Sequence, residues 1–168
     1  MLRVKQLTPL LRSLRLLPPS LVIALASLDA VAQNMAIKGA TILDATNGEM
    51  IKNHVVIVKD GRIDSVAPAR SVEIPKGIEV LDLQGHTLLP GLIDMHVHLT
   101  SGGRYHGYER LKLTDERRAI LGVVHAEQTL MAGFTTVRNV GAGSFGDVAL
   151  RDAINDGDIP GPRMLVSG

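Results

Sequence analysis

Residues 90–98 read Pro-Gly-Leu-Ile-Asp-Met-His-Val-His. The apolar run, closed by a small glycine-containing turn, predicts a buried strand over residues 92–98. Residues two apart in a strand point to the same side, so Asp94, His96 and His98 are expected on one face. Two adjacent imidazoles are costly to bury without a partner, and a divalent metal ion is a natural one. The stretch therefore predicts a metal site with His96 and His98 as ligands.

Downstream of this stretch, strand and helix patterns alternate. The predicted elements are a helix over residues 114–132, a strand over 134–138, a helix over 147–155 and a strand over 163–167. Thr114 is the expected N-cap of the first helix, and Gly133 is expected to end it. This alternation is typical of an α/β fold with a parallel sheet covered by helices. Functional sites of such folds gather at the C-terminal ends of the strands, where the histidine pair lies.

The glycine-rich segment 141–146 precedes one of these helices. It contains neither a Walker lysine nor the G-x-G-x-x-G pattern of dinucleotide-binding loops. It is therefore interpreted as an ordinary connection between strand and helix, without a phosphate site.

Upstream, residues 33–89 read as short strands without visible chemistry. Strands are predicted over residues 36–43, 54–58, 63–66, 78–83 and 87–89. Asn47-Gly48 and Lys59-Asp60-Gly61-Arg62 are turn sequences that favour hairpins. This region is expected to form a small β-sandwich or β-roll domain.

Residues 1–32 have the features of a signal peptide. A basic segment precedes an apolar run over residues 16–28, and Ala30-Val31-Ala32 offers the small-x-small pattern of a cleavage site. We expect cleavage after Ala32 and a periplasmic or secreted protein. The alternatives are an uncleaved membrane-surface anchor or a wrongly assigned start codon. The apolar run is too short to cross a bilayer core of ~30 Å as a helix.

Composition restricts the partners. The 168 residues contain 18 Lys+Arg and 17 Asp+Glu, for a formal net charge of +1. Binding to nucleic acid or to a membrane surface needs a concentrated basic field, so neither partner is expected once the signal peptide is removed. Because Cys is 0, a metal has to be held by histidines and carboxylates. A homo-oligomer remains open.

Three further residues are candidates for the site. Asp94 is expected either to hydrogen-bond a ligand histidine or to cap the strand. His106 follows the first strand in a glycine-rich loop and either lines a substrate pocket or lies in solvent. Arg138 ends the second strand and either binds a substrate carboxylate or forms a salt bridge. The remaining histidines are interpreted as packing, surface or structural residues: His54, His86 and His125.

Residues 88–99 resemble the first barrel strand of the metal-dependent amidohydrolase superfamily, which carries the signature Pro-Gly-x-x-Asp-x-His-x-His. Residues 59–63 and 82–85 look like parts of its N-terminal β domain. Residues 133–138 look like its second barrel strand, and residues 156–163 look like the approach to its third. Within the superfamily the chain looks most similar to the branch with Xaa-Pro dipeptidases and imidazolonepropionase-like enzymes.

The resemblance implies a (β/α)₈ TIM barrel, of which residues 90–168 hold only the first three strands, because a complete barrel takes ~250 residues. It also implies a divalent metal, usually two zinc ions, with His96 and His98 on the more buried one. The superfamily completes its site with a lysine, two later histidines and an aspartate that acts as base. None of these has a matching position, so no catalytic residue is assigned within this chain.

The resemblance implies a metal-dependent hydrolase of amide or other non-ester C–N bonds, with a small amide or dipeptide as substrate and this chain as its N-terminal fragment. The alternative is a catalytically inactive truncated fragment with at most weak metal binding. A third interpretation, an exported β-domain protein without enzymatic activity, leaves the position of the histidine pair at a strand end unexplained.

Overall fold

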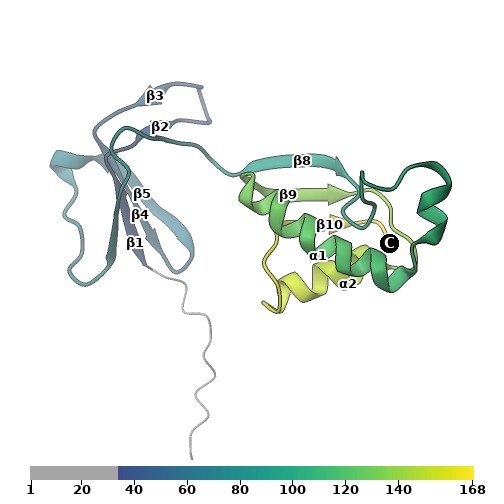
Figure 1. The fold of residues 1–168 in the computed structure, drawn as a ribbon. Coiled ribbons are helices and arrows are strands. Elements are labelled where there is room, and N and C mark those ends of the chain that lie inside the picture. Colours follow the sequence, from purple (N-terminus) through teal and green to yellow (C-terminus); the bar gives the residue numbers. More distant parts are fainter. Residues whose placement is uncertain (1–33) are drawn as a thin grey trace, which may run out of the picture.

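The computed structural model describes residues 34–168, so the predicted signal peptide and its cleavage site after Ala32 lie outside the described residues. Figure 1 shows two lobes joined by an extended connection before β8. We call residues 34–89 the β lobe and residues 90–168 the α/β lobe.

The β lobe contains two sheets. One has the strand order β5-β4-β1-β6 and the other has the order β3-β2-β7. The strands are β1 (Met35–Lys38), β2 (Thr41–Leu43), β3 (Met50–Ile51), β4 (His54–Lys59), β5 (Arg62–Pro68), β6 (Glu79–Asp82) and β7 (Thr87–Leu88), with a short 3-10 helix η1 (Ala69–Ser71) after β5. Buried Ala36, Val55 and Ile57 form the core of the first sheet.

The strand predicted over residues 36–43 is wrong in one respect, because the structure divides it between the two sheets. Gly39 separates β1 from β2 with a φ of 81°, a left-handed conformation that side chains rarely adopt. A Cβ on Gly39 would also meet the backbone of Gln84 at 2.9 Å. The turn therefore depends on the glycine, and the chain changes sheets there.

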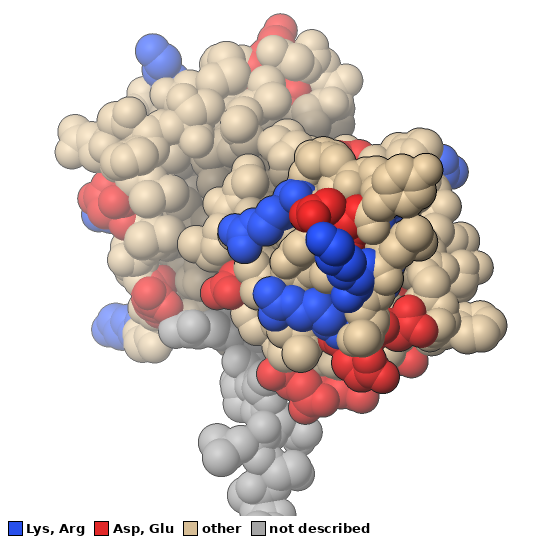
Figure 2. Space-filling view, turned by 45° about the vertical axis from the view of Figure 1, so that its right-hand side comes forward, with Lys and Arg blue, Asp and Glu red and all other residues tan. Residues whose placement is uncertain are grey.

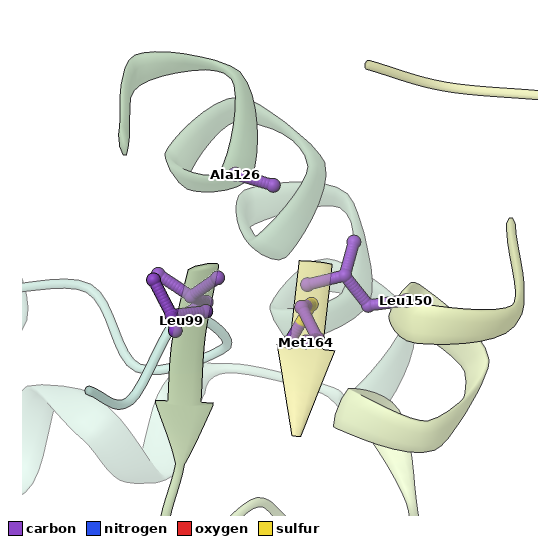
Figure 3. Packing of buried hydrophobic residues seen from close by; sticks show 5 residues of the cluster. Leu99, Ala126, Leu150 and Met164 are labelled. Atoms are coloured by element: carbon purple, nitrogen blue, oxygen red, sulfur yellow. The ribbon is translucent and has the colours of Figure 1, made fainter. Parts of the chain in front are cut away.

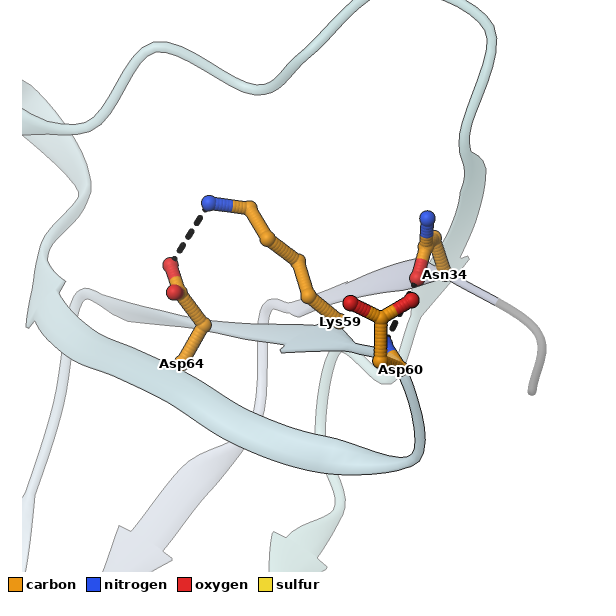
Figure 4. Close-up of polar contacts among 4 residues, drawn as sticks. All are labelled: Asn34, Lys59, Asp60 and Asp64. Atoms are coloured by element: carbon orange, nitrogen blue, oxygen red, sulfur yellow. Dashed lines mark hydrogen bonds and ion pairs between the residues drawn. The ribbon is translucent and has the colours of Figure 1, made fainter.

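The hairpin between β4 and β5 forms where the sequence predicts it. Asp60 and Gly61 have φ values of 49° and 70°, as a two-residue turn matched to the strand twist requires. The Asp60 backbone N–H donates to Asn34 Oδ1 at 2.9 Å, and Lys59 Nζ lies 2.9 Å from Asp64 Oδ2 (Figure 4). Both partners of this ion pair are roughly half exposed, so it adds only ~0–1 kcal/mol. The turn, rather than the ion pair, fixes the hairpin.

The α/β lobe has the predicted alternation of strands and helices. Its elements are β8 (Leu92–Val97), a 3-10 helix η2 (Gly107–Lys112), α1 (Asp115–Met131), β9 (Phe134–Asn139), α2 (Gly146–Asn155) and β10 (Arg163–Val166). The sheet order is β10-β9-β8, and both strand pairs are parallel. The expected parallel sheet is therefore confirmed for this lobe. The short helix η2 was not expected from the sequence.

One face of this sheet packs against both helices. Leu99, Ala126, Val137, Leu150 and Met164 form the buried cluster between them (Figure 3). Val137 and Ala126 are completely buried. The opposite face is open in the described residues, where Ile93 is 61% exposed and Leu165 is 51% exposed.

The surface carries both signs of charge. In the view of Figure 2, basic side chains lie beside acidic ones on the near face. Among the ion pairs of the described residues is that of Lys112 and Glu109 within η2, whose Nζ and Oε1 lie 2.8 Å apart.

Among residues 34–168, no helix has both the length and the hydrophobicity needed to cross a bilayer.

Candidate functional site

His96 and His98 lie side by side at the C-terminal end of β8. Their ring centroids are 5.5 Å apart, and the ring planes meet at 71°. Both side chains are exposed at the end of the strand. Two imidazoles at this separation are suited to bind one ion, and imidazole nitrogen is a preferred ligand of zinc and of several other divalent metals.

The ring of His98 is oriented by the loop after β9. His98 Nδ1 lies 3.2 Å from the backbone oxygen of Gly141. A carbonyl oxygen only accepts hydrogen bonds, so the neutral ring carries its proton on Nδ1 and keeps a free lone pair on Nε2. Metal-binding histidines almost always hold the non-ligating nitrogen in this way. His98 therefore presents Nε2 as the candidate ligand.

The position of Asp94 differs from the expected alternation. The pairing of β8 with β9 shifts register between Asp94 and Val97, and Asp94 is paired with the buried Val137. Paired residues in a sheet point to the same side, so Asp94 lies on the helix-facing side of the sheet. Val97, paired with the buried Asn139, lies on this side as well, so its neighbour His96 points to the opposite side. Asp94 Oδ1 accepts a hydrogen bond from the backbone N–H of His96 at 3.0 Å. The expectation of one shared face is wrong, because two strand residues are accommodated opposite one at the irregularity.

Two surface depressions meet at His98. One, of about 410 Å³, lies between β8 and α1 and includes Asp94 and His125 in its lining. The other, of about 400 Å³, includes His106 and Arg110. His106 thus lies in the wall of a depression that also contains a candidate metal ligand.

Arg138 lies on the exposed side of β9. Its Nε donates to the backbone oxygen of Met95 in the neighbouring strand at 2.8 Å. This hydrogen bond holds Nε of the guanidinium group against β8, next to His96.

The other histidines make local contacts. His125 is half-buried, and its Nδ1 lies 2.7 Å from the backbone oxygen of Leu99. His54 Nδ1 and His86 Nδ1 lie 2.7 Å and 3.2 Å from the backbone oxygens of Lys52 and Gln84. The structural, packing or surface roles interpreted for these three residues stay predictions.

Sequence reasoning missed two polar residues beneath the site. Asn139 ends β9 and Asp147 lies in the first turn of α2, and both are completely buried. They are hydrogen-bonded to each other. The sequence offered one indication of them: an amide directly after the predicted strand, followed by an acid at the start of the next predicted helix.

The described residues bring two candidate metal ligands together. Within residues 34–168, no group of three or more His, Cys, Asp or Glu side chains is placed to hold a metal ion. The pair His96 and His98 fits the chemistry of two ligands of a larger set, with the orientation of one ring already fixed.

Comparison with known proteins gives the family. The sequence model of the Amidohydrolase family matches residues 87–168, and that of the NagA composite domain matches residues 45–88. A dihydroorotase of Pelotomaculum thermopropionicum is 45% identical over 69 residues, which are 41% of this chain and 15% of the relative.

Two solved structures resemble the fold. Molinate hydrolase superimposes with a TM-score of 0.72 and 30% identity, covering 82% of this chain and 30% of that chain. A Xaa-Pro dipeptidase with methionine bound in its active site superimposes with a TM-score of 0.71 and 31% identity, covering 81% of this chain and 33% of that chain. This chain thus spans about a third of the length of these structures. By its sequence, its fold and the position of its histidine pair, the chain belongs to the metal-dependent amidohydrolase superfamily.

Proposed function

We propose that the protein containing this chain is a metal-dependent hydrolase of a non-ester C–N bond, in a small amide or a dipeptide. The observation that carries the proposal is the orientation of His98 by Gly141 beside His96 at a strand end. A bound divalent ion would polarise the substrate carbonyl and lower the pKa of water to ~7. Zinc, two ions in the whole enzyme, is the metal we propose.

The residues of this chain have separate roles in the proposal. His96 and His98 hold the metal. Asp94 fixes the backbone at His96, and so the direction in which that ring leaves the strand. His106 and Arg138 contact the substrate from the loop after β8 and from β9. The catalytic base is not among the residues that we assign.

We further propose that β8, β9 and β10 are the first three strands of a (β/α)₈ barrel, next to a β-sandwich formed by the β lobe. The parallel order of the strands, the similarity to barrel enzymes and the open apolar face of the sheet support this. Residues 34–168 by themselves would then bind metal weakly and lack activity, since two imidazoles are only part of a zinc ligand set.

Metal analysis and an amidase assay on the full-length protein test the proposal. We expect about two metal ions per chain and hydrolysis of dipeptides or small amides. His96→Ala should remove at least one ion and lower kcat/KM by about 100-fold or more, because one of the two assigned ligands is lost. The matched control, His86→Ala in the β lobe, should change neither quantity.

A folded full-length protein that holds no metal would contradict the assignment of His96 and His98. Equal metal content in His96→Ala and His86→Ala would contradict it as well.

We also propose that the enzyme is exported, on the basis of the basic and apolar segments and the Ala30-Val31-Ala32 pattern. The intact mass of the mature protein tests this. A chain beginning at Gln33 is expected, and a chain still carrying Met1 would refute the cleavage.

A further inference from the structure

Two buried polar side chains, which we call the polar cluster, lie near His98: one at the C-terminal end of β9 and one in the first turn of α2. Asn139 and Asp147 are both 0% exposed, next to an apolar cluster of the same lobe. Burying an amide and a carboxylate costs free energy unless their polar atoms are hydrogen-bonded. The contacts of each atom therefore indicate what the polar cluster holds in place.

The amide of Asn139 has one orientation that satisfies all its neighbours. Its Oδ1 accepts from the backbone N–H of Leu99 at 2.8 Å. Its Nδ2 donates to Asp147 Oδ2 and to the backbone oxygen of Gly141, both at 3.1 Å. A rotated amide would place donor against donor and acceptor against acceptor, so the side chain is fixed.

Asp147 anchors this amide from the helix side. Its Oδ1 accepts from the backbone N–H of Val148 at 2.9 Å, and its Oδ2 also accepts from the backbone N–H of Gly168 at 3.3 Å. A carboxylate in the first turn of a helix is favoured by the helix dipole. Asp147 therefore holds Nδ2 of Asn139 at a set position relative to α2 and to the end of β10.

The oxygen of Gly141 connects this cluster to the candidate metal ligand. It accepts from Asn139 Nδ2 at 3.1 Å and faces His98 Nδ1 at 3.2 Å. A carbonyl oxygen has two lone pairs, so both bonds are accommodated at once. The loop residue that orients His98 is thus itself oriented by Asn139.

We propose that Asn139, held by Asp147, is a positioning residue for His98: it fixes the Gly141 carbonyl, which keeps the proton of His98 on Nδ1 and leaves Nε2 for the metal. This inference rests on the proposed metal site. A free neutral histidine favours the form with the proton on Nε2, which is unable to ligate through that nitrogen. Removing such a partner of a ligand typically lowers metal affinity by about 10- to 100-fold.

Two variants of the full-length protein test the inference. Asn139→Ala removes the donor to Gly141. The exchanged pair, Asn139→Asp with Asp147→Asn, keeps the acceptor for Leu99 N–H and the bond between the two side chains, but no longer donates to Gly141 and no longer accepts from Gly168 N–H. It preserves volume and net charge, and so covers the case in which Asn139→Ala does not fold.

The control is Val137→Ala, also a completely buried residue of β9, whose side chain has no hydrogen-bonding group. It is expected to lower stability without removing any hydrogen bond of the cluster. Any effect of general destabilisation should therefore appear in this variant as well.

The main readout is the tautomer of His98 in the metal-free protein, from long-range ¹H–¹⁵N correlation spectra at a pH where the ring is neutral. The second is zinc affinity from competition with a chelator. We expect Nδ1–H to dominate in the wild type and in Val137→Ala. In both test variants the Nε2–H form should rise, and zinc affinity should fall about 10- to 100-fold.

An unchanged tautomer in the folded variants would overturn the inference. If the wild type shows the Nδ1–H form but binds no zinc, the proposed function is contradicted. The tautomer of His98 in the variants still tests the role of Asn139, because it is measured without metal.

Discussion

Thr114 illustrates how one side chain acts at the start of α1. Its hydroxyl oxygen accepts from the backbone N–H of Arg117 at 3.3 Å. Hydrogen bonding from Thr114 also lowers the pKa of the Glu116 carboxyl below its ordinary value of 4.5, with a smaller contribution from the backbone N–H of Glu116. The same hydroxyl thus accepts from the backbone of Arg117 and donates to the carboxylate of Glu116.

We predict that Thr114→Ala lowers the free energy of unfolding by about 0.5–2 kcal/mol, whereas Thr114→Ser retains most of it. Urea unfolding at neutral pH measures both. Because the pKa of Glu116 is lower in the folded state, its stabilising contribution is present above pH 4.5 and is lost as the pH falls through the lowered pKa. An NMR titration should show that pKa rising toward 4.5 in Thr114→Ala, and no change in it would refute the role of the hydroxyl.

At the residue scale, the sequence predicts interactions between residues that are close together in the chain. The cap at Thr114 and the pairing of His96 with His98 need only neighbours in the chain, and both rings do lie together. The side of Asp94 depends on a register shift against β9, which no pattern within β8 reveals. Asn139 and Asp147 meet only after a loop closes, so their cluster was beyond local reasoning.

At the scale of elements, the approach of β10 to α2 depends on one missing side chain. A Cβ built on Gly161 would overlap the end of the Ile154 side chain and lie 3.3 Å from Ala126 Cβ. Interiors of this density do not absorb an added methyl group without moving their neighbours. Gly161 therefore sets how closely the chain entering β10 passes the two helices.

We predict that Gly161→Ala lowers the free energy of unfolding by about 1–3 kcal/mol through overpacking. Ile154→Val removes the atom nearest to the added Cβ, so the double variant should lose less than the sum of the single losses. Gly143→Ala is the control, because the only atom near its Cβ is Asp115 Oδ1 at 3.8 Å. Strictly additive losses in urea unfolding would contradict this account of the packing.

The elements that the sequence predicts correctly are those fixed by hydrogen bonds between residues close together in the chain. The boundaries of α1 and the turn between β4 and β5 are encoded by caps and glycines, and they form as expected. The division of residues 36–43 into β1 and β2 was missed, because the alternating pattern is equally compatible with one strand. The two strands differ only in their partners: β1 pairs with β4 and β6, whereas β2 pairs with β3 and β7.

At the scale of the whole molecule, the two faces of the sheet in the α/β lobe differ sharply. One is covered by α1 and α2, while Leu165 on the other is 51% exposed among the described residues. In the proposed barrel this face becomes the packed interior. The open face is then a property of residues 34–168 and not of the folded enzyme.

We predict that Leu165→Lys destabilises the full-length protein by about 3–5 kcal/mol, the cost of an unpaired charge in an interior. Leu111→Lys is the control, since Leu111 is 79% exposed in η2 and should change stability by no more than about 0.5 kcal/mol. Thermal or urea unfolding of both variants gives the comparison. Equal, small effects would mean that the face stays in water and would contradict the barrel.

The acceptor that orients His98 belongs to the main chain of Gly141, so no exchange of side chains deletes it. Selection at this point acts on the path and length of the loop between Asn139 and Asp147, and much less on the identity of its exposed residues. Point changes at the exposed Gly143 are expected to accumulate during divergence, while insertions and deletions in the same loop are expected to be purged. The acceptor is therefore recorded in descendants as a constant spacing between Asn139 and Asp147, and the identity of the residue that supplies the carbonyl would not reveal it by itself.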